Sequence, residues 1–454
     1  MLCKKSNHQV NLIAVVIIVL YAVITFNFIY GNGEILEYPD SRSYYEVAAS
    51  PLFSGKLWAG DRAPLTPLFF KILNRNPFAI SISQIIISII AWSFLAVIIL
   101  TTTRSLLVGT IGALAILAYS VTDNIIIWNN MLLSESLGLS LLVALIGSWI
   151  LYLQKKTIMN SFLVVIISLA FAMTRDTNAY MLAMIGCVII IIEVLRRFIV
   201  GKPFKRSFLV IGVFYLAVFI LSVSSQNAGK RWVFPFYNVL SKRILPYPER
   251  REFFQDRGMP IDDALLNRSG KWALNDEGAY FNDPELQDFR LWAEEKGKRT
   301  YVAFLLHHPG YLAIEPFKPI FNMMNMDLSM YKSREFESSF PGKLWGRLVN
   351  KKTIPIFVIA SLVFGIFLIF LKGRNRNLSI AAMAIGLLAI PQYVISCHGD
   401  AMEVERHCLF SIVQWHLAFI LFSIVLIDYL VIKYSPSNKE LETYKKIQKI
   451  KCVL

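Results

Sequence analysis

The chain has 454 residues, of which 56% are hydrophobic and 17% are charged, and its mean hydropathy is +0.53. A chain this apolar is not an ordinary soluble enzyme, and it is too long to be one small domain. The formal net charge is +15, but no nucleic-acid recognition motif accompanies it. We therefore attribute the charge to membrane topology and to a basic carboxyl-terminal tail.

Apolar runs of about 20 residues, the length that crosses a bilayer as a helix, recur along the chain. We predict an all-α polytopic membrane protein with about ten transmembrane helices. The first run is too long for a signal-peptide core and has no small-residue cleavage site near it, so we expect it to stay uncleaved. The predicted spans are residues 10–30, 79–101, 105–122, 131–153, 158–174, 178–195, 207–225, 353–371, 377–396 and 409–432.

Lys and Arg mark alternate connections between these runs, and basic connections stay on the cytoplasmic side. The orientation therefore places the amino terminus inside and the acidic connections outside. We divide the chain into a membrane module at 1–225, a mostly helical external insert at 226–352, and further spans with a basic tail at 353–454. The compact chain favours a bacterial inner membrane, with an archaeal or lumenal membrane as the alternative. The basic positions are Lys4, Lys5, Arg104, Lys155, Lys156, Arg196, Arg197, Lys202, Lys205, Arg206, Lys372, Arg374, Arg376 and the tail lysines from Lys433 to Lys451.

The first external loop, residues 31–78, contains the stretch ILEYPDSRSYYEVAAS. Ser43 followed three positions later by Glu46 fits a capping box, so we predict a surface helix that begins at Ser43. Asp40 then lies just before the helix, with Tyr44 as an interfacial anchor. From local spacing alone, Asp40 is either a helix cap or a functional carboxylate.

Charged residues also lie at the external ends of later segments. The stretch GDRAPLTPLF predicts a second surface segment, in which we expect Arg62 to pair with its neighbour Asp61. Glu135 lies in an apolar run, where a carboxylate either faces a protein interior or cavity or complements the dipole of the first helical turn. Arg175 and Asp176, in TRDTNAY, form either a solvated corner or an anion site.

The last external loop, CHGDAMEVERHC, is the richest in charge. Arg406 and His407 lie at the amino end of the final span, a position suited to binding phosphate. An ordinary polar loop is the alternative. His398, Asp400 and His407 match no metal-binding spacing, so we predict no metal site there. The five cysteines show no metal or disulfide spacing either.

Together these stretches resemble the GT-C superfamily of membrane glycosyltransferases, in the group of protein O-mannosyltransferases and aminoarabinose transferases. The motifs that carry the resemblance are PDSRSYYEVA, GDRAPLTPLF, SESLGL, TRDTNAY and EVERH. It covers residues 10–200 and is only topological beyond them. It implies a polyprenyl-phosphate sugar donor used at the external face, and an essential acid in the first loop, Asp40 or, second, Glu37. The loop lacks the adjacent Asp-Glu pair of the O-mannosyltransferases.

The resemblance and the chemistry of inverting sugar transfer suggest roles for these residues. Asp40 acts as general base on the acceptor hydroxyl, and Glu135 orients a sugar or supports a divalent cation if one is used. The cations Arg175, Arg406 and His407 stabilise the departing phosphate. The acceptor is a glycan, a lipid or a protein. The expected substrate-binding residues are Glu37, Tyr44, Arg62, Asp176 and Glu403.

Two other classes of protein share this topology. A lipid-linked oligosaccharide polymerase or ligase would use the same kind of donor but depend on external Arg and His instead of an acidic base. A membrane transporter would bury charged pairs in the middle of the bilayer and contain broken spans. The observed charges gather at external span ends, which favours glycosyl transfer.

Overall fold

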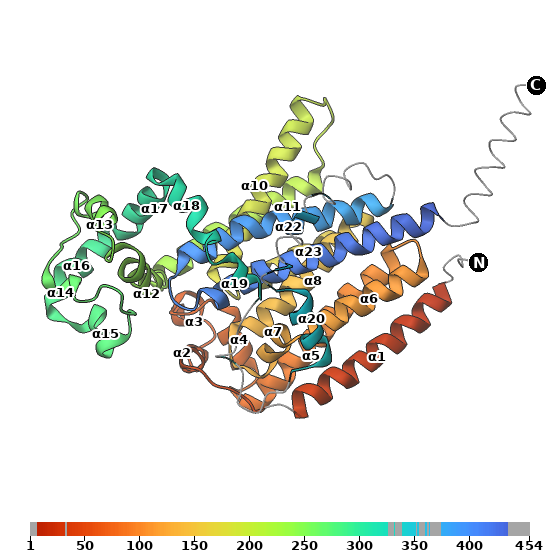
Figure 1. The fold of residues 1–454 in the computed structure, drawn as a ribbon, viewed down its shortest axis with the longest axis horizontal. Helices are drawn as coiled ribbons and strands as arrows, with labels where there is room; N and C mark the ends of the chain where they lie inside the picture. The colour runs from red at the N-terminus through yellow and green to blue at the C-terminus, as the bar shows by residue number, and fades with distance from the viewer. Residues whose placement is uncertain are drawn as a thin grey trace, which may run out of the picture.

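The structure is a computed structural model that describes residues 7–31, 34–325, 331, 338–350, 352–353, 359–360, 363 and 374–434. Within these residues the secondary structure is helical, apart from an isolated parallel bridge between Leu36 and Met131. Figure 1 shows a long helical bundle with the amino terminus at one end and a group of short helices at the other.

Seven described helices are long and apolar enough to cross a bilayer. Because they are separate and lie together in one bundle, the predicted all-α polytopic membrane protein is confirmed. They are α1 (Asn7–Gly31), α5 (Pro77–Thr102), α8 (Ser134–Gln154), α10 (Asp176–Phe198), α11 (Arg206–Ala228), α22 (Arg374–Gly399) and α23 (Val404–Lys433).

The predicted number of about ten spans is not confirmed within the described residues. The expected spans 105–122 and 158–174 correspond to α6 (Leu106–Ser120) and α9 (Ile158–Ala172), which have 15 residues each and are short for a bilayer. A bend of 61° links α6 to the next short helices, and counting this bent pair as one span gives eight. These are α7 (Asp123–Ile126) and η1 (Ile127–Asn130). The expected span 353–371 lies largely outside the described residues.

The connections that carry basic residues gather at one end of the bundle, which we call the basic end. Near the end of α23, the Asp428 carboxylate accepts hydrogen bonds from the backbone N–H groups of Arg104 (2.9 Å) and Ser105 (2.8 Å), between α5 and α6. In the same region the Asn377 side chain donates to the carbonyl of Leu153, at the end of α8 (3.0 Å). The alternation seen in the sequence therefore corresponds to a real grouping in space.

The opposite end of the bundle, which we call the site end, holds the loop between α1 and α5. Its helices are α2 (Pro39–Ala48), α3 (Gly55–Ala59) and α4 (Leu65–Ile72). The loop is tied to two other connections by backbone hydrogen bonds, from Leu36 to Asn130 (2.9 Å) and from Leu65 to Met173 (2.9 Å). These bonds bring the first loop against the amino ends of α8 and α10.

The insert after α11 packs around its own aromatic core at the site end (Figure 1). Phe236, Phe254, Phe289 and Phe304 are among the buried members of this core. Its helices are α12 (Val233–Val239), η2 (Leu240–Ile244), α13 (Pro248–Gln255), α14 (Asp263–Leu266), α15 (Asn275–Asn282), η3 (Pro284–Leu286), α16 (Gln287–Trp292), η4 (Ala293–Gly297), α17 (Lys298–His307), α18 (Pro309–Ile314) and η5 (Glu315–Phe317).

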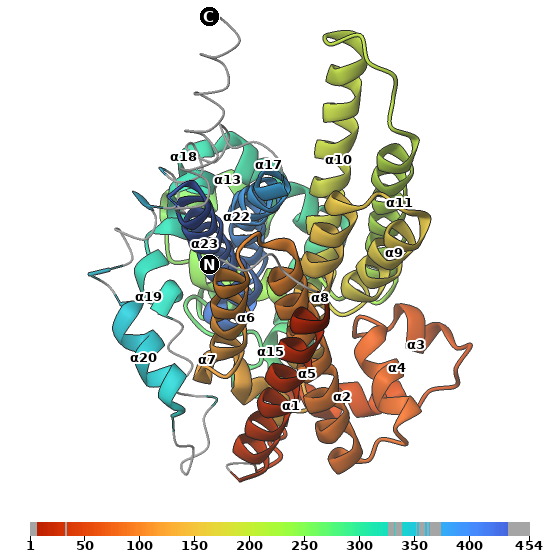
Figure 2. The ribbon, with the colours of Figure 1, turned by 90° about the vertical axis from the view of Figure 1, so that its right-hand side faces the viewer.

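The last part of the predicted insert runs back along the bundle. Helices α19 (Ile320–Asn325) and α20 (Phe340–Leu348) lie beside α23 and α6, as Figure 2 shows. The Trp345 ring of α20 is 4.8 Å from the Tyr119 ring and 5.2 Å from the His416 ring. Residues 338–350 therefore pack against the long apolar helices, while α12–α18 form a separate helical unit at the site end.

Candidate functional site

Helix α2 begins at Pro39, four residues before the predicted start at Ser43, so that prediction was wrong. Proline suits the first helical position because its fixed φ matches the helix and its missing N–H has no helical partner there. The Ser41 hydroxyl then accepts the backbone N–H of Tyr38 at 3.0 Å. Asp40 consequently lies inside the first helical turn and not before it.

Asp40 is held by two arginines from distant parts of the chain. One carboxylate oxygen accepts from Arg62 Nη2 at 2.7 Å and the other from Arg406 Nη1 at 2.9 Å. Its side chain is 32% exposed. Burial acts to raise the pKa of Asp40, but the charges of Arg62 and Arg406 outweigh it and lower the pKa to about 2. Asp40 is therefore an ionised carboxylate in this arrangement.

Arg62 does not make the predicted pair with its neighbour Asp61. Its guanidinium instead reaches α2, where it donates to Asp40 and, from Nε, to the Ser43 hydroxyl at 2.7 Å. It also lies 5.0 Å from the centre of the buried Tyr44 ring. Ser43 does not cap a helix, because α2 already begins at Pro39. Its hydroxyl instead accepts a hydrogen bond from Arg62.

Arg406, in the first turn of α23, is the centre of the charged group. Its Nη1 atom contacts Asp40 and also Glu403 at 2.8 Å, while its Nε donates to Glu135 at 2.5 Å. Its side chain is only 5% exposed. Three carboxylates from three separate segments therefore surround one buried guanidinium.

Glu135, in the first turn of α8, is fully buried. Its Oε1 atom accepts from Arg406 and lies 3.2 Å from Nη1 of Arg175. Its Oε2 atom is buried and has no hydrogen-bond partner in the described part of the chain. A buried carboxylate oxygen left in this way can accept a hydrogen bond from water or from a ligand. Of the two predicted alternatives for Glu135, these contacts favour a carboxylate that faces the protein interior. A helix-dipole role alone would need no contact with Arg406 or Arg175.

Arg175, just before α10, extends the charged group toward the loop between α22 and α23. Its Nη2 atom donates to Nδ1 of His407 at 3.0 Å, and its guanidinium lies 5.5 Å from the centre of the Phe410 ring. His407 in turn lies 3.4 Å from Asp400 through Nε2. We use the name charge cluster for Asp40, Arg62, Glu135, Arg175, Glu403 and Arg406.

Glu403 joins the cluster through an unusual backbone conformation. Its φ of 48° and ψ of 42° lie in the left-handed region, which residues with a Cβ rarely adopt. This conformation comes immediately before α23 and brings the Glu403 carboxylate to Arg406. Backbone strain of this kind is typical of functional sites.

Three of the predicted substrate-binding residues, Glu37, Tyr44 and Asp176, lie outside the charge cluster, and of these Tyr44 contacts it through Arg62. Asp176 makes a bidentate ion pair with Arg231, whose Nε and Nη2 atoms each donate to one carboxylate oxygen at 2.9 Å. Arg231 also donates to the backbone carbonyl of Gly60, so this pair fastens the first loop to the end of α11. Glu37 accepts the Tyr45 hydroxyl at 3.1 Å on the surface of α2.

Sequence reasoning missed several partners of the site. Arg231 and Asn238 follow α11 in a segment with no recognisable motif, so only the fold could bring them to Asp176 and Asp400. For Asp400 the sequence predicted no metal site and indicated no other role. His398, from the same loop, contacts the carbonyl of Leu312 through Nε2 at 3.0 Å. Among the described residues, no group of three potential metal ligands occurs.

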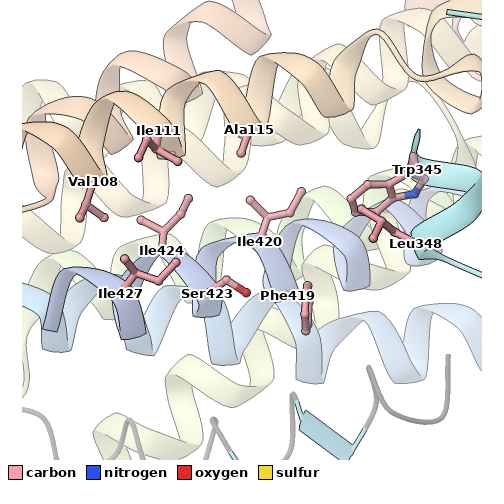
Figure 3. Close-up of a pocket in the computed structure, with 11 residues that line it drawn as sticks. Val108, Ile111, Ala115, Trp345, Leu348, Phe419, Ile420, Ser423, Ile424 and Ile427 are labelled. Atoms are coloured by element: carbon pink, nitrogen blue, oxygen red, sulfur yellow. The ribbon is translucent and has the colours of Figure 1, made fainter. Parts of the chain in front are cut away.

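An apolar groove of about 340 Å³ lies between α6 and α23 and is closed at one end by α20. Figure 3 shows Val108 and Ile111 of α6 pointing toward Ile420 and Ile424 of α23. Phe419 lies 13 residues beyond Arg406 on the same helix, which is about 20 Å at 1.5 Å per residue. On α23 the groove therefore begins about 20 Å from Arg406 and extends toward the basic end. It is also lined by Gly112, Ala115, Trp345, Leu348, Ser423 and Ile427.

No protein-family model matches this chain, and no curated protein matches it in sequence. The chemistry of the site must therefore be inferred from its geometry. The charge cluster contains three carboxylates and three guanidinium groups, so its formal charges balance.

Proposed function

We propose that this protein transfers a sugar from a polyprenyl-phosphate donor to an acceptor hydroxyl at the outer face of a membrane. The observation that carries the proposal is the grouping of Asp40 with three buried or half-buried arginines at one end of a membrane bundle. A membrane-embedded phosphate donor needs cations at the ends of the spans and an apolar surface below them. The acceptor is a glycan, a lipid or a protein.

The donor phosphate competes with carboxylates for the same guanidinium groups. Arg406 and Arg175 both contact one oxygen of Glu135, and arginine binds phosphate as readily as carboxylate through paired hydrogen bonds. A phosphodiester between these two side chains would face the amino end of α23, where the helix dipole favours an anion. The apolar groove along Ile420 and Ile424 would take part of the polyprenyl chain.

The transfer step uses Asp40 as general base. The acceptor oxygen attacks the anomeric carbon, its proton passes to the Asp40 carboxylate, and the bond from that carbon to the phosphate oxygen breaks. Polyprenyl phosphate leaves with the bonding electron pair, and attack opposite the leaving group inverts the anomeric configuration. The free oxygen of Glu135 accepts a hydroxyl of the sugar.

Donor binding would also make Asp40 a better base. A carboxylate with a pKa of about 2 has little affinity for a proton while Arg62 and Arg406 hold it. Once the donor phosphate draws Arg406 away, one oxygen of Asp40 is released and its proton affinity rises. The base would then act only when the donor is in place.

The test is transfer by purified protein in detergent from a panel of radiolabelled polyprenyl-phosphate sugars, with membrane extracts as the source of acceptors. We expect release of polyprenyl phosphate by the wild type and loss of release in a folded Asp40→Asn variant. Asp61→Asn is the matched control, because it removes a neighbouring acid outside the cluster and should leave transfer intact.

The same experiment separates the alternatives. Release that survives in Asp40→Asn but disappears in Arg406→Gln would indicate a lipid-linked oligosaccharide polymerase or ligase. If the wild type consumes no donor, the result would favour a membrane transporter. Against transport, the buried ion pairs of the described spans lie at their ends, at Glu135 and Arg406 and, at the basic end, at Glu193 and Arg196. The 61° bend between α6 and α7 is a feature that a transporter would share.

A further inference from the structure

Asp400 lies outside the charge cluster but is held in one orientation. Its Oδ1 atom accepts three hydrogen bonds, from the backbone N–H groups of Ala401 (2.7 Å) and Met402 (2.9 Å) and from Nδ2 of Asn238 (3.0 Å). The side chain is 8% exposed. With Oδ1 fully used, Oδ2 is the atom that faces Nε2 of His407 at 3.4 Å.

This arrangement determines which nitrogen of His407 carries the proton. The Arg175 guanidinium has only donors, so Nδ1 of His407, 3.0 Å from Nη2 of Arg175, must be the acceptor. The proton of the neutral ring then resides on Nε2 and points to the acidic Oδ2 of Asp400. His407 is therefore a neutral acceptor toward Arg175 in this state. It does not act as a cation beside Arg175 and Arg406, as the sequence had suggested.

The orientation of Arg175 depends on this pair of contacts. One of its terminal nitrogens lies 3.2 Å from Glu135 and the other donates to His407, with the Phe410 ring 5.5 Å from the guanidinium. Its side chain is only 13% exposed. If His407 presented an N–H from Nδ1, two donors would oppose each other and Arg175 would turn away.

We propose that Asp400 is a positioning residue that selects the tautomer of His407 and so aims Arg175 at the phosphate of the donor. The phosphate ligand rests on the proposed function, whereas the tautomer does not. Asn238 extends the chain of contacts to the insert, because its buried side-chain oxygen accepts the backbone N–H of Ala273 at 2.9 Å. The insert thereby holds the loop that orients the phosphate-binding arginine.

Replacing Asp400 by asparagine gives a sharp test. The three donors around Oδ1 require the amide oxygen at that position, so the amide nitrogen of Asp400→Asn must face His407. His407 Nε2 would then become the acceptor and its proton would move to Nδ1, opposite Arg175. The backbone fold is preserved by this change, because all three hydrogen bonds to the oxygen remain.

The direct measurement is the ¹⁵N spectrum of histidine-labelled full-length protein in detergent at about pH 8, above the ordinary titration range of histidine. The chain has six histidines, and the difference from a His407→Gln variant assigns the signal. We expect a protonated Nε2 and a bare Nδ1 in the wild type, and the reverse in Asp400→Asn. A wild-type His407 protonated at Nδ1 would overturn the proposal, even if Asp400→Asn failed to fold.

A double-mutant cycle tests whether Asp400 acts through Arg175. The probe is farnesyl phosphate, titrated calorimetrically into the purified protein. We expect Asp400→Asn to weaken binding about tenfold, the loss typical of one hydrogen bond to a charged group. In an Arg175→Gln background, the same change should have no further effect. Equal losses in both backgrounds would contradict the proposal.

The two readouts distinguish this inference from the proposed function. If farnesyl phosphate binds and the cycle shows coupling but no sugar donor is consumed, the positioning role stands and the transferase assignment fails. If sugar is transferred while Asp400→Asn leaves both the tautomer and the affinity unchanged, the positioning role fails alone.

Discussion

At the scale of single residues, the site depends on one guanidinium with three carboxylate partners. Arg406 contacts Asp40, Glu135 and Glu403 and is almost fully buried. Buried charges are costly to leave unpaired, so the first loop, α8 and α23 are held together by the same residue that is proposed to bind substrate.

The first prediction concerns the cost of removing Arg406. The change Arg406→Leu leaves three carboxylates facing one another without their shared cation. We expect a loss of about 3–5 kcal/mol in the free energy of unfolding in mixed micelles. The control is Arg42→Leu, which breaks the exposed pair with Glu46 and should cost less than about 1 kcal/mol. Equal costs for the two variants would mean that the buried pairs contribute nothing.

The second prediction follows from the lowered pKa of Asp40. A carboxyl group whose pKa falls from 3.8 to about 2 on folding adds stability that is complete above about pH 5 and lost as the pH falls toward 2. The difference in unfolding temperature between wild type and Asp40→Asn should therefore stay constant from pH 7 to about 5 and shrink below it. A difference that already shrinks between pH 7 and 5 would show that Arg62 and Arg406 do not hold the carboxylate.

At the scale of elements, a contact between α8 and α23 positions the aromatic ring that lies beside Arg175. A Cβ atom on Gly138 of α8 would lie 2.4 Å from the Phe410 ring of α23. The Phe410 ring in turn lies beside the Arg175 guanidinium. The contact of Gly138 with Phe410 therefore reaches the charge cluster through one aromatic side chain.

The third prediction tests this packing. The change Gly138→Ala should displace Phe410 and lower both the unfolding temperature and the affinity for farnesyl phosphate, although alanine is the better helix former. Gly386→Ala in α22 is the matched control, because its new Cβ would meet only Ala418 at an ordinary 3.4 Å. We expect the control to be neutral or slightly stabilising. A neutral Gly138→Ala would contradict the close contact.

Sequence patterns predicted the long helices well because each of them carries an apolar run of about the length that crosses a bilayer. They failed where local signals compete. The Ser43–Glu46 pair resembles a cap, but Pro39 and Ser41 begin α2 earlier. Likewise the Arg62 side chain does not pair with its neighbour Asp61, because the fold of the loop brings Asp40 within 2.7 Å.

At the scale of the whole molecule, the alternation of basic and acidic connections corresponds to two separate ends of the bundle. This could be predicted because each connection contributes its own charges. Which acids meet which arginines could not be predicted, since Asp40, Glu135 and Arg406 are far apart in the sequence. The pairing of Asp176 with Arg231 also depended on how the insert packs.

The fourth prediction concerns orientation. Lys56 of the first loop and Lys155 after α8 are both exposed and lie at the site end and the basic end. Each would be changed to cysteine in a variant whose five native cysteines are serine. In intact bacterial cells, a membrane-impermeant maleimide should label Lys56→Cys, and it should label Lys155→Cys only after the cells are permeabilised. The reverse pattern would place the charge cluster on the cytoplasmic side.

The most direct test of the central claim is a structure of the full-length protein bound to polyprenyl phosphate, determined by cryo-electron microscopy. Our account predicts the phosphate within hydrogen-bond distance of Arg406 and Arg175, Asp40 released from Arg406, and the chain in the groove beside Ile420 and Ile424. A phosphate bound elsewhere, with the Asp40–Arg406 pair intact, would contradict the claim that this cluster is a donor site.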